Sequence, residues 1–184
     1  MSGSSSDATL RLSLPTVETA ARPLEQEVIE LFEQLRNRIL RYLLSLGLPA
    51  HDGEEIIQEV FLALFQHLRR GKSRANLRGW VFRVAHNLAM RQRNASRREV
   101  QDCTDPGEGA DPSPNPEEQV LTNQRQQLLL AVVRALPEQD QYCLYLRAEG
   151  LKYREIADVL GISLGSVSNS LAKSLERLGR ADGR

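Results

Sequence analysis

Apolar side chains recur every three or four residues through most of the chain, which is the spacing of amphipathic α-helices. In the N-terminal half the pattern predicts three helices, over residues 23–45, 52–70 and 80–98, with Asp52 as the N-cap of the second. Their predicted core-facing side chains are Leu24, Val28, Leu31, Phe32, Leu35, Ile39, Tyr42, Leu43, Leu46, Ile57, Val60, Phe61, Leu64, Leu68, Leu77, Val81, Val84, Ala85 and Leu88.

The periodicity stops at residues 99–116, where four prolines, two glycines and many acids leave too little apolar surface to fold. It resumes in helices over 119–136, ended by Pro137, and 138–149, ended by Gly150. We therefore predict an all-α protein with an N-terminal domain of three to four helices and a C-terminal domain of four helices, joined by an acidic, Pro-rich linker. The predicted divisions are a disordered extension over 1–22, domains over 23–98 and 117–180, and the linker over 99–116.

The segment YREIADVLGISLGSVSNSLAKSLERL predicts a helix-turn-helix at the end of the second domain. Ala157 supplies the small residue needed where the two helices cross, and Gly161 supplies the positive φ needed at the turn. Ser163 is the expected N-cap of the second helix. The apolar residues expected to lock the pair and to line the second helix are Ile156, Leu160, Ile162, Val167, Leu171, Leu175 and Leu178. A plain helical hairpin in a bundle is the alternative.

The second helix of such a motif presents its N-terminal half to base edges in the major groove. The residues predicted to contact DNA are Ser166, Ser168 and Asn169 on bases, and Lys152, Tyr153, Arg154 and Lys173 on phosphates. Because phosphate neutralisation sets much of the affinity, so few charges predict weak binding by this unit alone.

The net charge of zero conceals two opposite blocks. Residues 69–98 hold ten Lys or Arg and no acid, whereas residues 99–118 hold seven Asp or Glu and no base. On a helical projection of residues 80–98 one flank carries an aromatic ring, amides and guanidiniums: Trp80, Arg83, Asn87, Arg91, Asn94 and Arg98. This combination suits a single strand whose bases are stacked upon and hydrogen-bonded. A solvated basic face, with Trp80 at the edge of the core, is the alternative.

The predicted second helix has an acidic, amide-rich face that contains a leucine: Glu55, Gln58, Glu59, Leu62 and Gln66. Such a face repels DNA and suits a protein partner, although by spacing alone a solvated face is equally consistent. No catalytic constellation and no metal or cofactor site is predicted. Cys103 and Cys143 form no CxxC pair, and we find neither an export signal nor a membrane span, so we expect a cytoplasmic protein.

Three stretches resemble bacterial RNA polymerase sigma factors of the sigma-70 superfamily. DGEEIIQEVFLALF resembles that family's D-x-E-D-[LIV]-[LIV]-Q-E-[VA]-F stretch, and LRGWVFRVAHNLAMRQRNASRR resembles the F-x-x-W-L-[YF]-R-I-A-x-N helix that follows it. ALPEQDQYCLYLRAEGLKYREIADVLGISLGSVSNSLAKSLERL is similar to the promoter-reading C-terminal domain. With only these two domains, over residues 24–180, the chain is similar to the extracytoplasmic-function group.

The resemblance implies roles for residues that match its motifs. Asp52, with Glu55, Gln58, Glu59 and Leu62, would bind the clamp helices of the largest subunit of core RNA polymerase. Trp80, Arg83, Asn87 and Arg91 would melt and read the −10 element on the non-template strand, with Asn87 beside a flipped base. The predicted helix-turn-helix would read the −35 element of promoter DNA, and an anti-sigma factor is a further partner that the resemblance allows.

The chain is then expected to be a transcription initiation factor and not an enzyme. Two other interpretations stay open: a free-standing helix-turn-helix regulator, and a polymerase-binding protein with weakened promoter reading.

Overall fold

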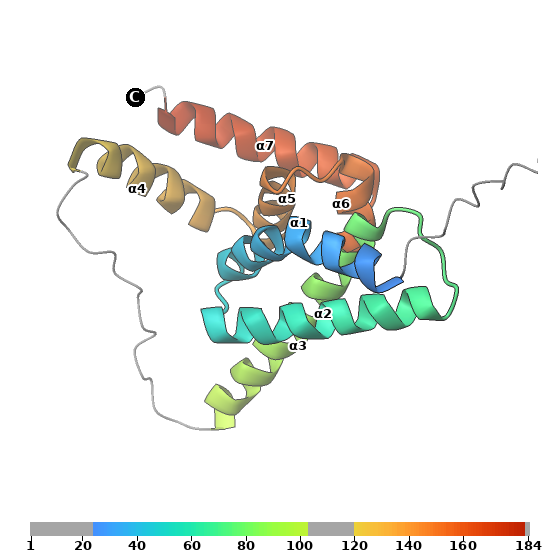
Figure 1. Ribbon diagram of the computed structural model, residues 1–184. Helices are drawn as coiled ribbons and strands as arrows, with labels where there is room; N and C mark the ends of the chain where they lie inside the picture. Colours follow the sequence, from blue (N-terminus) through green and yellow to red (C-terminus); the bar gives the residue numbers. More distant parts are fainter. Residues whose placement is uncertain (1–23, 103–119, 183–184) are drawn as a thin grey trace, which may run out of the picture.

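The computed structural model describes residues 24–102 and 120–182, and these form seven α-helices and no strand (Figure 1). The helices are α1 (Leu24–Ser45), α2 (Ala50–Arg69), α3 (Leu77–Asp102), α4 (Val120–Arg134), α5 (Glu138–Ala148), α6 (Tyr153–Leu160) and α7 (Leu164–Asp182). The all-α prediction is confirmed. The predicted extension over 1–22, and all but the first four residues of the predicted linker, lie outside the described residues.

Helices α1, α2 and α3 pack around large apolar side chains. The rings of Phe32 and Phe61 meet edge to face with centroids 5.0 Å apart, joining α1 to α2. Tyr42 and Phe82, both fully buried, meet 5.9 Å apart and join α1 to α3. Such edge-to-face pairs fix ring orientation as well as burying apolar area. These ring contacts therefore help to fix the orientation of α2 and α3 relative to α1, and with it the direction of their outer faces.

The start of α2 differs from the sequence prediction. We expected Asp52 to cap this helix, but α2 begins at Ala50 and Pro49 is its N-cap, so Asp52 lies in the first helical turn. Proline fixes the φ that a helix start requires, and a carboxylate in the first turn is favoured by the helix dipole. The helix therefore starts two residues before the predicted cap, and the Asp52 carboxylate still stabilises the N-terminus of α2 electrostatically.

Helices α6 and α7 form the predicted helix-turn-helix. Gly161 ends α6 with φ of +66°, a left-handed conformation that glycine adopts without steric cost. Ser163 precedes α7, and its Oγ accepts a hydrogen bond of 3.0 Å from the Ser166 backbone N–H, as an N-cap does. Both of these predictions are confirmed.

The buried face of α7 is rotated relative to the sequence prediction. Val167 and Leu171 are buried, but Leu175, which was predicted to share their apolar face, is 57% exposed. Ser170 and Ser174 are buried instead, and the Ser174 hydroxyl donates to the Ser170 carbonyl over 2.7 Å. A serine that bonds to its own helix in this way needs no outside partner. These small side chains face α5, whose buried Cys143 lies beside Ser170.

The helix-turn-helix region does not stand apart from α1–α3. Figure 1 shows α7 along the top of the molecule, with α5 and α6 between it and the first three helices. Helix α6 packs along α3, and α5 also reaches α1. Among the described helices, none is long and apolar enough to cross a membrane.

Candidate nucleic-acid and protein interfaces

The outer face of α2 carries the predicted protein-binding residues on its exposed side. Glu55, Gln58 and Glu59 are exposed, and Leu62 has 60% of its surface open to solvent. Asp52 is half-buried at the edge of this face. The helix thus presents a leucine within a ring of acids and amides. We refer to these five residues as the α2 face.

The remaining acid of this helix points elsewhere. Glu54 accepts a hydrogen bond of 2.6 Å from Arg36 of α1, so it holds two helices together rather than meeting a partner. His51 lies 3.4 Å from the Glu55 carboxylate, one turn along the helix. Glu54, which pairs with Arg36 of α1, is therefore not part of the α2 face.

The outer side of α3 brings the predicted strand-binding residues into one row. Arg83, Asn87 and Arg91 are exposed at successive helical turns, and Trp80 is half-buried at the start of the row. The Trp80 ring lies against His67 of α2, with centroids 4.7 Å apart. An indole supported on one side and open on the other can stack on a base without losing its orientation. We refer to Trp80, Arg83, Asn87 and Arg91 as the α3 face; Asn94 is also exposed, and the Arg98 side chain lies outside the described part.

Two arginines of α3 point away from the α3 face and hold the fold together, a role that the sequence analysis did not predict. Arg78 and Arg93 point toward α5, where Arg78 bonds to Glu149 and Arg93 bonds to Tyr142. Counting charges along the sequence could not separate them from Arg83 and Arg91. The helical period offered a signal, because Arg78 and Arg93 are spaced with the buried Phe82 and His86 rather than with Asn87.

His86 lies between the two halves of the molecule. Its Nδ1 is 2.8 Å from the Tyr42 hydroxyl, and the Tyr142 ring meets it edge to face at 5.4 Å. Burial, and secondarily the nearby Arg93 charge, lower the pKa of His86 to about 4. The imidazole is therefore neutral near pH 7 and serves in packing.

The predicted DNA-reading side of the helix-turn-helix faces outward. The exposed residues of the predicted set are Lys152, Tyr153, Arg154, Ser168, Asn169 and Lys173. Ser166 is half-buried, and its hydroxyl lies 2.9 Å from that of Ser163, so part of its bonding capacity is used within the turn. Leu164, which the sequence reasoning did not select, is 47% exposed at the first residue of α7. Such an apolar side chain suits contact with a thymine methyl group.

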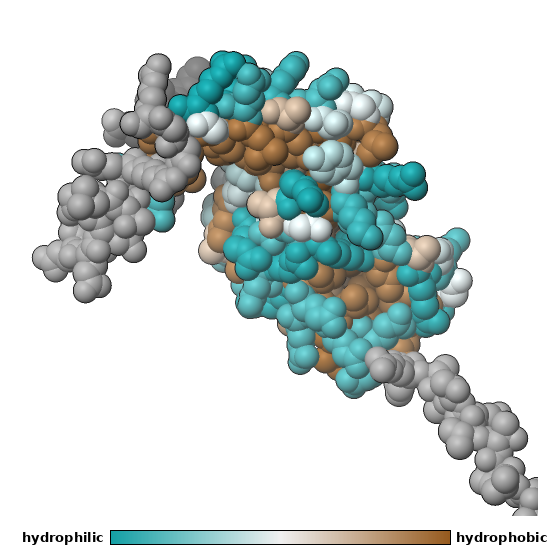
Figure 2. All heavy atoms as spheres, turned by 90° about the horizontal axis from the view of Figure 1, so that it is seen from above, coloured by the Kyte–Doolittle hydropathy of each residue, from teal (hydrophilic) through white to brown (hydrophobic). Residues whose placement is uncertain are grey.

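The surface around α7 is not a continuous basic patch. Seen from above, it shows hydrophobic side chains gathered between hydrophilic ones (Figure 2). Glu176 and Arg180 pair with each other at 2.6 Å, which neutralises one of the arginines beyond Lys173. Near this helix, phosphate attraction is therefore modest, in agreement with the sequence estimate.

The described helices combine an acidic face with an exposed leucine, a basic face with an indole, and a helix-turn-helix, a combination typical of DNA-binding proteins of transcription. Comparison with known families identifies the family. The model described as Sigma-70 region 2 matches residues 31–99, and that described as Sigma-70, region 4 matches residues 126–178. Together they cover well over half of the chain, which belongs to the sigma-70 family.

The curated relatives that the chain resembles are named RNA polymerase sigma factors. The chain is 28% identical over 174 residues to a probable RNA polymerase sigma factor, RfaY, of Xanthomonas campestris pv. campestris, covering 91% of this chain and 42% of the relative. It is 29% identical to the ECF RNA polymerase sigma factor SigE of Mycolicibacterium smegmatis (89% and 63% covered). It is 25% identical to the ECF RNA polymerase sigma-E factor of Escherichia coli K12 (74% and 76% covered). The chain thus spans about half the length of the first two of these relatives.

Solved structures share the fold. The sigma factor RpoE of Bartonella quintana, solved with the anti-sigma factor NepR, matches with a TM-score of 0.62 at 19% identity, covering 85% of this chain and 94% of that one. CnrH, solved with the cytosolic domain of CnrY, matches with a TM-score of 0.58 at 19% identity, covering 85% and 87%. At this identity the likeness concerns the fold.

Proposed function

We propose that this chain is a transcription initiation factor that binds core RNA polymerase and directs it to promoters by reading −10 and −35 elements. The observation that carries the proposal is the α3 face. It presents Trp80, Arg83, Asn87 and Arg91 on a unit separate from the helix-turn-helix. A regulator that reads duplex DNA with α7 alone has no use for such a face.

Each face is assigned one task. The α2 face binds the clamp helices of the polymerase's largest subunit, with Leu62 as its apolar centre. The α3 face melts the −10 element and reads its non-template strand, with Asn87 beside an extruded base. On the C-terminal unit, Lys152, Tyr153, Arg154 and Lys173 hold phosphates, while Ser166, Ser168 and Asn169 read bases of the −35 element.

The weak charge of α7 fits this arrangement. A reader that is held beside its site by a larger assembly acts at a high effective concentration and needs little affinity of its own. Excess charge would instead favour non-specific DNA, because phosphate contacts carry no sequence information. A modestly charged helix on a tethered unit is therefore suited to reading one element without trapping the protein elsewhere.

The domain boundaries that we propose are 23–98 and 117–180, joined by an acidic linker over 99–116 whose first four residues continue helix α3. Its carboxylates would run along the nucleic-acid path of the polymerase. Chemistry is left to the polymerase, so this chain has no catalytic role and acts in the cytoplasm beside the chromosome. Because the RpoE relative was solved with an anti-sigma factor, we propose such a protein as a further partner.

The test combines assembly with transcription. The purified chain is mixed with core RNA polymerase, separated by gel filtration, and used in run-off transcription on promoter templates. Co-elution followed by promoter-specific RNA is expected. Tight binding to duplex DNA by the chain alone, with no polymerase binding, would instead indicate a free-standing regulator. Co-elution without promoter-specific RNA would indicate an interaction protein that has lost promoter reading.

A further inference from the structure

His67, near the C-terminal end of α2, contacts two segments that carry candidate strand-binding groups. Its imidazole lies against the Trp80 indole, with centroids 4.7 Å apart and ring planes inclined at 41°. Its Nε2 lies 3.0 Å from the backbone carbonyl oxygen of Ser73, in the loop between α2 and α3. A carbonyl oxygen only accepts, so Nε2 carries the proton of this hydrogen bond. One side chain therefore joins the start of α3 to the loop that precedes it.

The loop between α2 and α3 is also held by contacts that do not involve the His67 side chain. Asn76 Oδ1 accepts a hydrogen bond of 3.1 Å from the Gly79 backbone N–H and so caps the start of α3. Arg74 Nε lies 3.2 Å from the Glu27 carboxylate of α1. Replacing the imidazole therefore leaves the loop attached to α1 and α3, and changes only how the loop lies beside the indole.

The end of α2 and the loop place cations close to His67 in the chain. Arg69, Arg70 and Lys72 are all exposed. Proteins that hold single strands combine aromatic rings, on which bases stack, with cations that attract the phosphates. For one strand to use both, the ring must be held at a fixed place relative to the cations. The His67 side chain supplies this link, because it contacts the ring of Trp80 and hydrogen-bonds to the loop.

The location of His67 separates this role from support of the core. Leu68, the next residue, is 4% exposed and packs in the core, whereas His67 is half-buried at its edge. Substitutions away from the packed core usually change stability little. His67 can therefore be replaced while the fold is kept, and the effect of its replacement falls on the indole and the loop.

We propose that His67 is a positioning residue for −10 reading: its ring supports the Trp80 indole, and its Nε2–H keeps the loop beside that indole. This rests on the proposed function, in which the indole belongs to the α3 face that reads the non-template strand. His67 acts through Trp80 and the loop, without touching the strand. It holds the stacking surface and the loop cations in one arrangement before the strand arrives, so less order has to be gained on binding.

The first measurement uses the free, full-length chain. Trp80 is its single tryptophan, so the fluorescence of this indole reports on the arrangement without a label. His67→Ala removes both the ring and the donor, whereas His67→Phe keeps a ring without the donor. Quenching by acrylamide should be about twofold stronger in His67→Ala, because the indole loses a covering ring, and close to wild type in His67→Phe. Gln34→Ala, an exposed change on α1, is the matched control and should behave as the wild type.

The second measurement uses the holoenzyme and a labelled single-stranded oligonucleotide from the −10 region of a template that it transcribes. Trp80→Ala is expected to weaken binding by about thirtyfold and His67→Ala by about fivefold, because a base loses its stacking partner or finds it misplaced. His67→Phe should lie between His67→Ala and the wild type, since it lacks the bond to Ser73. The double variant His67→Ala, Trp80→Ala should bind at most about twofold more weakly than Trp80→Ala alone, because His67 acts through the indole.

Two checks separate positioning from damage to the fold. Circular dichroism of each variant and its binding to core polymerase should both match the wild type. If His67→Ala is not folded, His67→Phe decides, because a ring of similar size fills the same place. Oligonucleotide binding by His67→Phe equal to that of the wild type would then overturn the part assigned to Ser73 and the loop.

Three results would overturn the proposal as a whole. The first is unchanged oligonucleotide binding in His67→Ala. The second is the same loss from His67→Ala whether or not Trp80 is present. The third is a wild-type holoenzyme that assembles but does not bind the oligonucleotide, in which case the proposed function fails as well. The quenching measurement on the free chain keeps these cases distinct, since it shows whether His67 holds the indole independently of polymerase and promoter.

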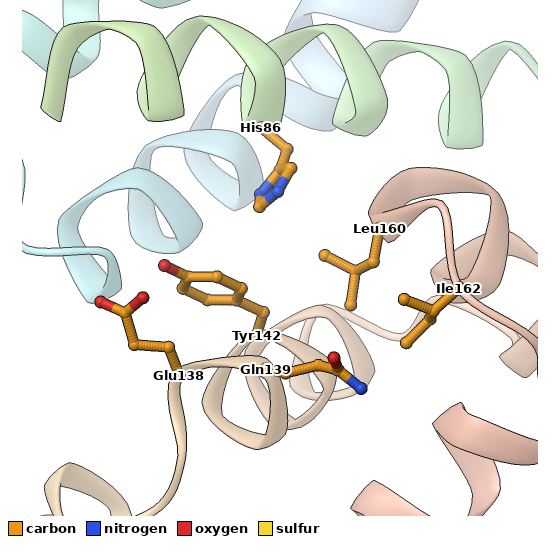
Figure 3. Close-up of a pocket in the computed structure, with 6 residues that line it drawn as sticks. All are labelled: His86, Glu138, Gln139, Tyr142, Leu160 and Ile162. Carbon is orange, nitrogen blue, oxygen red and sulfur yellow. The ribbon is translucent and has the colours of Figure 1, made fainter. Parts of the chain in front are cut away.

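The cavity beside His86 is not part of this arrangement. It has a volume of about 270 Å³ and is lined from the other side by Tyr142, Leu160 and Ile162 (Figure 3). Because His86 is buried while Trp80 and His67 are half-buried on α3 and α2, substitutions at His67 leave this cavity unchanged. The two histidines can therefore be tested separately.

Discussion

The two helical units place their polar groups in opposite ways. In α1–α3 the interior is built from large apolar side chains such as Tyr42, Phe82 and Leu64, and the charges stand outside on the α2 and α3 faces. In α4–α7 the interior includes Ser170 and Ser174, while the reading side of α7 carries few charges. Under the proposed function, the first unit would supply most of the binding strength, and the second would be carried to its site.

This difference suggests a division of tasks, in which α1–α3 would supply binding affinity and α7 would supply sequence specificity. If α2 and α3 supply most of the binding energy, then variants in the first unit should have larger effects than matched variants in α7. The following predictions are ordered by expected size and would each sharpen or break that contrast.

Reversing two charges on the α2 face should have the largest effect. The double variant Glu55→Lys, Glu59→Lys is expected to weaken binding to core polymerase by about a thousandfold. A polymerase surface that complements the two glutamates is basic, so it would repel the introduced lysines. Fluorescence anisotropy with labelled chain measures the affinity. The control is Glu25→Lys, Glu33→Lys, the same charge change on exposed positions of α1. Equal loss in both would mean that total charge, and not this face, governs assembly.

Acidification should destabilise the boundary between the two units. Since the pKa of His86 is about 4 in the folded chain and near 6.5 when unfolded, the unfolded chain binds more protons between these values. The free energy of unfolding should therefore fall as the pH drops from about 6.5 to 4, by at most about 3 kcal/mol. Urea titrations across this range measure it, with His86→Gln as the variant that lacks this slope. The same slope in His86→Gln would assign the effect to other groups.

Truncating the α3 face should impair melting while sparing assembly. Asn87→Ala with Arg91→Ala is expected to reduce open-complex formation by about thirtyfold, since unstacked bases lose both a hydrogen-bonding and a stacking partner. Permanganate reactivity of unpaired thymines in the promoter reports melting. Polymerase binding by the same variant serves as the internal control and should be unchanged; reduced binding would show that the α2 and α3 faces are not independent.

The smallest effect is expected on α7. Lys173→Ala should weaken −35 binding by about fivefold and lower the slope of log affinity against log salt by about one, because one phosphate contact is lost. Arg180→Ala, an exposed arginine already paired with Glu176, is the control. Holoenzyme binding to a fork template at several salt concentrations gives both quantities. A loss larger than that of the α3-face variant would reverse the contrast between the units.

The parts of this fold that depend on local periodicity were predictable, and those that depend on distant partners were not. The spacing of Val60, Phe61 and Leu64 was enough to place α2, and Gly161 was enough to place the turn before α7. The buried face of α7 was missed because a hydropathy pattern counts Ser174 as polar. The Ser174 hydroxyl donates to its own helix, which allows the side chain to be buried. Glu149 could not be recognised as a buried group, since its partners are more than seventy residues away in the sequence.

The buried thiol of Cys143 offers a way to measure how often the C-terminal helices open. Burial raises the pKa of its thiol, so at neutral pH the reactive thiolate is scarce as well as shielded. Because it sits between α5 and α7, an alkylating reagent can reach it only in molecules where those helices have come apart. In a Cys103→Ser background the rate at which the reagent modifies Cys143 would therefore report how often α5 and α7 come apart, with no label introduced into the chain.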